Sequence, residues 1–197
     1  MKSAVLYNRF LNMASICFIV FFCACTTTSV PNLYRDAEMD FASIHTVVVM
    51  PFGNLTTDRM ASDRVREAFS NKLLSTNAVY VVPSGEVARG IAKAGVTDAT
   101  IPSTEEIVKI AAIIKADALI TGMVSEYGVI KSGATSANVI SISLQMIDVQ
   151  TRKVVWTASS TKGGISVLDR LFGGGGAPMN DVTEAAIDDV INKLFND

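Results

Sequence analysis

The stretch Ile140-Ser141-Ile142-Ser143-Leu144-Gln145-Met146 alternates between apolar and polar side chains. Because successive side chains of a β-strand point to opposite faces, this alternation predicts a strand with one buried and one polar face. Apolar runs precede it at residues 118–124 and follow it at residues 154–159, the second run after a turn at residues 148–153. We therefore expect residues 118–161 to form three consecutive antiparallel strands.

Shorter elements are expected before these strands. Residues 45–50 are rich in β-branched side chains and stop at Pro51, which predicts the first, central strand. Apolar residues at helical spacing predict an amphipathic helix at residues 59–75, and Ser103 and Glu106 have the capping-box spacing that begins a helix. The remaining expected elements are a strand at residues 79–82, a small helix from Ser84 and a last helix at residues 180–195.

The expected order of elements is β-α-β-α-α-β-β-β-α. This order is typical of an α+β fold (an α/β sandwich), in which helices pack on a mixed β-sheet. Hydrophobic residues make up 49% of the sequence, and short runs of Val and Ile contribute to this excess, as expected for buried strands.

The N-terminus has the pattern of a secretory signal. Lys2 and Arg9 come before or at the start of an uncharged run of 15 residues that ends at Ala24, shorter than the ~20 residues of a spanning helix. Cys25 follows, and a signal peptidase requires a small residue such as Ala24 just before the cut. The pattern resembles the lipobox of bacterial lipoproteins, which implies cleavage after Ala24 and a lipid on Cys25.

The lipoprotein interpretation divides the chain into three parts. Residues 1–24 are then the signal peptide, residues 25–43 a lipidated tether, and residues 44–197 a single globular periplasmic domain. Thr and Ser rather than Asp follow the cysteine, which resembles lipoproteins passed to the outer membrane, with the domain facing the periplasm. An uncleaved membrane anchor, ordinary signal cleavage and a start at Met13 are the alternatives.

The net charge argues against some classes of binding partner, and the cysteine content indicates how the domain is stabilised. The full sequence has a formal net charge of −2, and loss of Lys2 and Arg9 with the signal leaves −4. A mildly acidic chain argues against nucleic acid or an anionic bilayer surface as the main partner. Apart from Cys25, no cysteine remains in the mature chain, so the domain is expected to fold without a disulfide.

No pattern in the sequence indicates an active site, a metal site or a cofactor site. His45 is the single histidine, has no ligand cluster at metal-binding spacing, and is expected at a strand edge. Asp188-Asp189 and Glu105-Glu106 are expected on solvated helix faces or helix starts. The glycines at residues 173–176 lack a following Lys-Ser or Lys-Thr, which argues against nucleotide binding. We expect a protein that is not an enzyme.

Three segments resemble a known family. They are Pro51-Phe52-x-Asn54-x-Thr56, residues 116–122 and residues 146–156. They are similar to the periplasmic domain of CsgG-like curli secretion lipoproteins and to LpoB-like lipoproteins, which activate peptidoglycan synthases. The resemblance spans residues 44–195 and implies a non-catalytic outer-membrane lipoprotein, an accessory or assembly and secretion factor that acts through protein contacts. An LpoB-like activator of a peptidoglycan synthase is the alternative, and a homo-oligomer formed through the core stays open.

Two segments are candidate contact surfaces for an envelope protein partner. The hairpin tip at residues 127–137 presents Tyr127 and Ile130. The second segment presents an apolar cluster that is expected to contact a protein partner or a membrane surface, with folding back onto the sheet as the alternative: Val167, Leu168, Leu171 and Phe172. The insertions at residues 128–137 and 163–178 are 10 and 16 residues long, too short for membrane-spanning hairpins, so we expect no pore.

Overall fold

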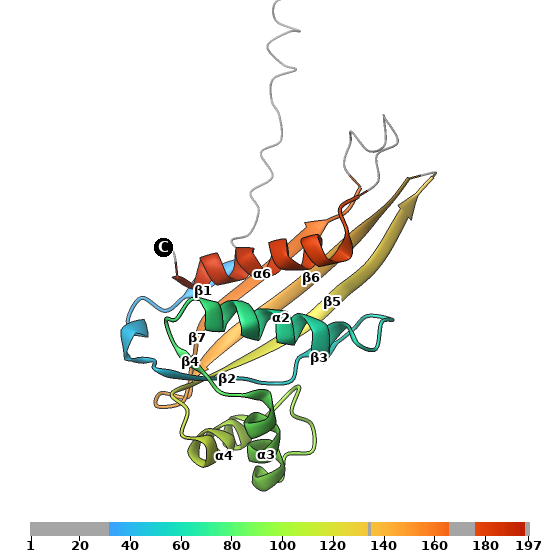
Figure 1. The fold of residues 1–197 in the computed structure, drawn as a ribbon. Helices are drawn as coiled ribbons and strands as arrows, with labels where there is room; N and C mark the ends of the chain where they lie inside the picture. Colours follow the sequence, from blue (N-terminus) through green and yellow to red (C-terminus); the bar gives the residue numbers. More distant parts are fainter. Residues whose placement is uncertain (1–31, 134, 166–175, 196–197) are drawn as a thin grey trace, which may run out of the picture. The chain divides into compact units, whose positions relative to one another are not determined.

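A seven-stranded mixed β-sheet runs through the part of the chain that the computed structural model describes, residues 32–133, 135–165 and 176–195 (Figure 1). The strand order is β1-β7-β6-β5-β2-β4, and β3 pairs with β5. The strands are β1 (Leu33–Arg35), β2 (Thr46–Val49), β3 (Gly53–Asn54), β4 (Tyr80–Val81), β5 (Ala118–Ser132), β6 (Thr135–Asp148) and β7 (Val154–Gly163). The helices are η1 (Phe41–Ser43), α2 (Ala61–Ser75), α3 (Ser84–Ala94), α4 (Thr104–Ile114) and α6 (Met179–Phe195). The predicted α+β fold is confirmed.

The three consecutive antiparallel strands form the middle of the sheet, as predicted. β6 pairs with β5 along its whole length and with β7 from Val139 onward, so that Gln145 lies between Thr121 and Thr157. β2 and β3 each pair in parallel with β5, and β4 pairs in parallel with β2. β2 is therefore an interior strand near one edge, and the central position that the sequence analysis gave it belongs to β6 and β5.

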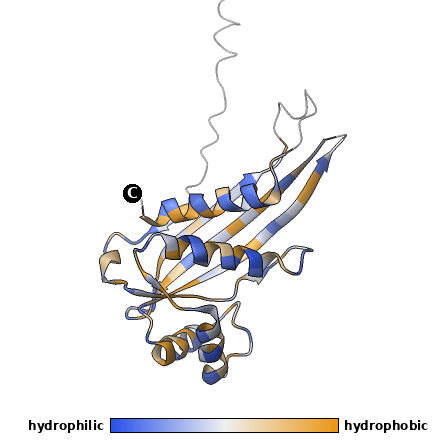
Figure 2. Ribbon diagram, viewed as in Figure 1, coloured by the Kyte–Doolittle hydropathy of each residue, from blue (hydrophilic) through white to orange (hydrophobic). Residues whose placement is uncertain are grey.

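Helices α2 and α6 cover one face of the sheet. Each has an apolar stripe and a polar stripe along its length (Figure 2), and the apolar stripes bury Phe69 and Ile187. The sheet contributes the alternate apolar residues of β6 and also Trp156, which is 0% exposed. The indole Nε1 of Trp156 donates a 3.1 Å hydrogen bond to the carbonyl oxygen of Lys193 in α6. This bond satisfies the one polar group of a buried tryptophan, as burial requires.

Helices α3 and α4 cover part of the other face through a second apolar cluster. Val48 and Leu119, which alternate with residues of the first core, pack there against Ile110. The predicted capping box is confirmed, because Ser103 Oγ accepts from the Glu106 amide at 3.3 Å and Glu106 Oε2 accepts from the Ser103 amide at 2.8 Å. These bonds satisfy amides that would otherwise lack partners at the first turn of α4.

Asp117 joins the start of β5 to the start of β2. Its Oδ2 accepts hydrogen bonds from the main-chain amides of His45 at 2.9 Å and Thr46 at 2.8 Å. The Asp117 amide in turn donates to the Thr46 carbonyl oxygen at 2.9 Å. Hydrogen bonds that include a charged group are among the stronger ones in proteins, so this aspartate fixes where the two parallel strands begin.

The turn between β6 and β7 places a non-glycine residue in the left-handed region. Arg152 has φ 62°, a conformation that costs an L-residue free energy. Asp148 compensates, because one of its carboxylate oxygens accepts from the Thr151 amide at 2.7 Å and from the Thr151 hydroxyl at 2.6 Å. The Arg152 amide also donates to the Asp148 carbonyl oxygen at 2.8 Å.

Two short strands lie where the sequence analysis expected irregular chain. Residues 25–43 were expected to be a tether, yet β1 within this range pairs with β7. Arg35 donates through Nη1 to the Leu194 carbonyl oxygen at 2.6 Å, and its guanidinium lies 4.2 Å from the centre of the Phe41 ring. β3 forms in the loop after Pro51. Segments of three and two residues are too short to show a period, which is why the sequence does not reveal them.

Candidate functional site

The distal half of the β5–β6 hairpin extends past the strands that flank it. β3 pairs with β5 only as far as Val124, and β7 pairs with β6 only from Val139 onward. Residues 125–138, which we call the hairpin arm, are therefore paired only within the hairpin as far as the described strands show. Figure 1 shows the arm projecting beyond α2 and α6. A β-bulge between Val124 and Glu126 marks its beginning.

The hairpin arm carries both of the contact residues that were predicted for the hairpin. Tyr127 is half-buried and packs against the core under α2 and α6. Ile130 is 41% exposed, and Val129, which the prediction did not include, is 59% exposed. The arm therefore presents two aliphatic side chains to solvent, while Tyr127 contributes part of its surface to the core.

The second predicted contact segment lies outside the described residues, but both of its ends are visible. Val167, Leu168, Leu171 and Phe172 belong to the undescribed part, as do Ala24 and Cys25. On one side of the segment the Gly164 amide donates to the Asn138 carbonyl oxygen at 2.8 Å. On the other side Asn138 Nδ2 donates to the Ala177 carbonyl oxygen at 2.8 Å. Both ends are thus bound to one residue of the hairpin arm.

Gly163 allows the close approach between β7 and the hairpin arm. Its φ is 82°, in the region that favours glycine. A Cβ at this position would overlap the Asn138 carbonyl oxygen and would lie 2.9 Å from Val182 Cγ1. A side chain here would push Gly163 away from Asn138 and Val182.

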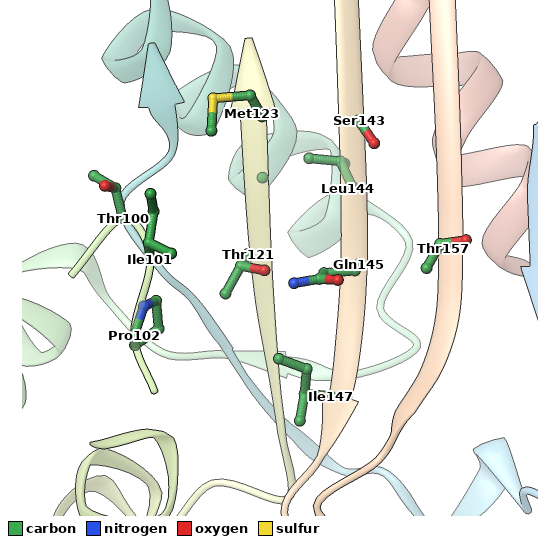
Figure 3. A pocket seen from close by; sticks show the side chains of 11 residues that line it. Thr100, Ile101, Pro102, Thr121, Met123, Ser143, Leu144, Gln145, Ile147 and Thr157 are labelled. Carbon is green, nitrogen blue, oxygen red and sulfur yellow. The ribbon is translucent and has the colours of Figure 1, made fainter. Parts of the chain in front are cut away.

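The face of the sheet opposite α2 and α6 is only partly covered. An open cavity of about 290 Å³ lies there between the sheet and the loop that precedes α4. Thr121, Gln145 and Thr157 form a row across β5, β6 and β7 on its floor (Figure 3). Ile101, 72% exposed, stands at its wall. The polar residues of the alternating stretch, Ser141, Ser143 and Gln145, predicted that one face of the sheet is polar. No pattern in the sequence predicts that the loop before α4 forms the wall of a cavity there.

Several charged side chains of α6 and α2 have structural partners. Burial alone would raise the pKa of Asp189, but the hydrogen bond from Lys193 and the charges of Lys193 and Lys162 hold it below its ordinary value. Asp188 pairs with Lys72 at 2.7 Å. On α2, burial lowers the pKa of Arg66, which donates twice to the Val49 carbonyl oxygen. These groups join elements to one another. Arg66 also lines an open cavity beside Asp63 and Glu67, but its hydrogen bonds go to the main chain of β2.

The remaining candidates for chemistry are also dispersed. Glu106 serves the capping box, and Asp58 pairs with Arg64 at 3.1 Å. Within the described ranges, no group of three or more His, Cys, Asp and Glu side chains is arranged to hold a metal ion. None of the helices in those ranges is both long and apolar enough to cross a membrane.

These features define an α+β domain with a projecting hairpin and a partly uncovered sheet face. The chain belongs to the LpoB family, because the family model described as peptidoglycan-synthase activator LpoB matches residues 28–161, more than half of its length. It is thus one of the LpoB-like envelope lipoproteins, and the predicted family is confirmed. No curated protein matches the sequence.

Solved structures show the same fold at low sequence identity. A PelC dodecamer from Paraburkholderia phytofirmans aligns with a TM-score of 0.54 and 18% identity, covering 82% of this chain and 95% of that chain. Lipoprotein GNA1162 from Neisseria meningitidis aligns with a TM-score of 0.56 and 20% identity, covering 78% of this chain and 99% of that chain. At this identity the likeness concerns the fold alone.

Proposed function

We propose that this protein is a non-catalytic lipoprotein that activates a peptidoglycan synthase by direct contact. The observation that carries the proposal is the match of the LpoB family model over residues 28–161. It favours the alternative of the sequence analysis, activation of a synthase, over the accessory or secretion function. In this proposal Cys25 carries the lipid, and the domain faces the periplasm from the outer membrane.

The hairpin arm is the contact surface that fits this function best. Exposed aliphatic side chains on a projecting element can be desolvated by a partner without loss of the protein's own core. Ile130 meets this requirement, since it is 41% exposed at the end of the arm. Gly164 and Ala177, which flank the second predicted contact segment, both bond to Asn138 of the arm. We keep Val167, Leu168, Leu171 and Phe172 as proposed contact residues.

Activation is tested with the full-length lipoprotein and the purified peptidoglycan synthases of the source organism. The rate of glycan polymerisation from the lipid-linked precursor is measured with and without the lipoprotein, and an increase is expected for at least one synthase. Ile130→Asp is expected to abolish the increase, because a charge would be desolvated in the contact. No increase with any synthase would exclude the proposed function.

A matched control separates the contact from general destabilisation. Ile113 lies on α4, outside the hairpin arm, and is 42% exposed, almost the same fraction as Ile130. Ile113→Asp introduces the same charge and is expected to leave activation unchanged. If both variants lose activation equally, the hairpin arm is not the contact surface.

A further inference from the structure

One edge of the hairpin arm has no strand beside it in the described part of the chain. β5 pairs with β2 as far as Ile120 and with β3 as far as Val124, whose carbonyl oxygen accepts from the Leu55 amide at 2.9 Å. From Glu126 to Ser132, β5 pairs only with β6 on its other side, and Ser125 lies in the bulge without a partner in the β5–β6 register. Alternate residues of such a strand direct their N–H and C=O groups outward. These eight residues therefore present a row of groups that another strand can satisfy.

Apart from the bulge at its start and Lys131, this edge lacks the features that usually prevent strand pairing. The two outer edges of the sheet, β1 and β4, are only three and two residues long. The free edge of β5 is longer, contains no proline, and has one acidic and one basic residue, Glu126 and Lys131. Natural edge strands are commonly protected by proline, by clustered charge or by short length, and here the length and the exposed Val129 and Ile130 favour pairing instead.

We propose that residues 125–132 pair in antiparallel orientation with the same residues of a second copy of this chain. A two-fold axis perpendicular to the sheet places opposite one another only residues that share a face. With Gly128 at the axis, Tyr127 lies opposite Val129 of the second copy, and the same pair occurs twice. Aromatic and β-branched side chains form favourable cross-strand pairs.

The charges of this edge permit a second copy as its occupant. In the same register Glu126 lies opposite Ile130 of the second copy, and Lys131 lies beside the bulge at Ser125 of the second copy. The acid and the base are on opposite faces of β5, because they are an odd number of residues apart. No like charges meet in this register, so the edge is compatible with itself without any change in sequence.

The expected association is weak in solution and stronger at a membrane. An eight-residue strand edge buries less than the ~800 Å² per partner of a standard interface. Attachment of both copies to one surface would raise their effective concentration. The inference concerns main-chain pairing of β5 and does not rest on the proposed activation of a synthase.

Cysteine cross-linking of the full-length protein in isolated membranes tests the pairing. The double variant Glu126→Cys/Ile130→Cys places the two thiols opposite one another across the two copies, and oxidation is expected to give a species of twice the mass on a non-reducing gel. Neither single variant should do so, because identical positions 126 are then four residues, about 13 Å, apart along the strands, too far for a disulfide. Co-expression of the two single variants should restore the species.

A further substitution tests whether the cross-linked product of twice the mass depends on the free edge of β5. In the double-cysteine protein, Val129→Lys is expected to lower the cross-linked fraction by about fivefold or more, because it removes both Tyr127–Val129 pairs. Val154→Lys, the same change at an exposed position of β7, should leave the fraction unchanged. Absence of the doubled species, equal yield from the single variants, or an adduct with a different protein would each overturn the proposal.

Discussion

Lys193 bonds to Asp189 one helical turn before it and, at the same time, to the sheet beneath. Its Nζ lies 2.9 Å from Asp189 Oδ2 and 2.8 Å from the carbonyl oxygen of Ser159 in β7. Lys162, also in β7, lies 3.5 Å from the other carboxylate oxygen. Asp189 therefore contributes to the attachment of α6 to β7 only while it is ionised.

The first prediction is a pH dependence of this attachment. The pKa of Asp189 is lower in the folded protein than its ordinary value, so its contribution is fully present above the unfolded pKa of about 4 and is lost as the pH falls through the folded pKa. Asp189→Asn should lower the free energy of unfolding by about 0.5–1 kcal/mol at pH 7 and by less at pH 3. Urea unfolding at both pH values measures this difference.

Asp188→Asn is the control for this prediction. Its partner Lys72 is half-exposed, so a smaller loss of unfolding free energy is expected. Equal losses for Asp189→Asn at pH 7 and pH 3 would contradict the prediction.

The second prediction concerns Asp117. Asp117→Ala removes an ionised acceptor from the two main-chain amides at the start of β2, and should cost about 2–3 kcal/mol of unfolding free energy. Asp117→Asn retains one acceptor oxygen without the charge, so its loss should be intermediate. Chemical denaturation followed by the fluorescence of Trp156, the single tryptophan, gives both values. An alanine variant as stable as the asparagine variant would show that the amides find water instead.

The third prediction separates backbone strain from steric overlap at two glycines. Gly133 and Gly163 both have positive φ, but a Cβ at Gly133 would meet nothing within 4 Å, whereas one at Gly163 would overlap Asn138. Gly133→Ala should cost about 1 kcal/mol through φ alone. Gly163→Ala should cost clearly more, and the amide of Gly164 should exchange faster with solvent deuterium because its bond to Asn138 is displaced. Equal costs would mean that the strand shifts without penalty.

The fourth prediction concerns the N-terminus. If Cys25 is the lipid-attachment residue, then globomycin, an inhibitor of lipoprotein signal peptidase, should cause the full precursor to accumulate. Cys25→Ser should prevent lipidation, and the protein should no longer fractionate with the outer membrane. Cys23→Ser is the matched control and should be processed normally. Normal processing of the Cys25→Ser variant would remove the lipoprotein interpretation.

Local patterns account for the elements that the sequence predicted well. The alternation from Ile140 to Met146 needs no knowledge of other strands, and β6 has the predicted buried face. The capping box of α4 likewise depends on Ser103 and Glu106 alone. In both cases the information lies within a few consecutive residues, and tertiary contacts reinforce the local preference.

The features that escaped prediction depend on pairing between distant segments. β1 forms because residues 33–35 meet the free edge of β7, which three residues cannot indicate by themselves. The exposure of Ile130 was expected, but the length of the hairpin arm follows from where β3 and β7 stop pairing. The cavity beside Ile101 exists because α3 and α4 cover only one end of the second sheet face, and no motif marks that arrangement.

The position of β1 limits how far the domain can lie from a lipid attached to Cys25. Leu33 is already held in the sheet through β7, and only residues 26–32 separate it from Cys25. Eight steps of fully extended chain span at most about 29 Å. A lipid on Cys25 would therefore keep the edge strand within about 30 Å of the bilayer. If the lipid attachment and the synthase contact proposed above both hold, the synthase would have to reach the domain within this distance of the membrane that carries the lipid.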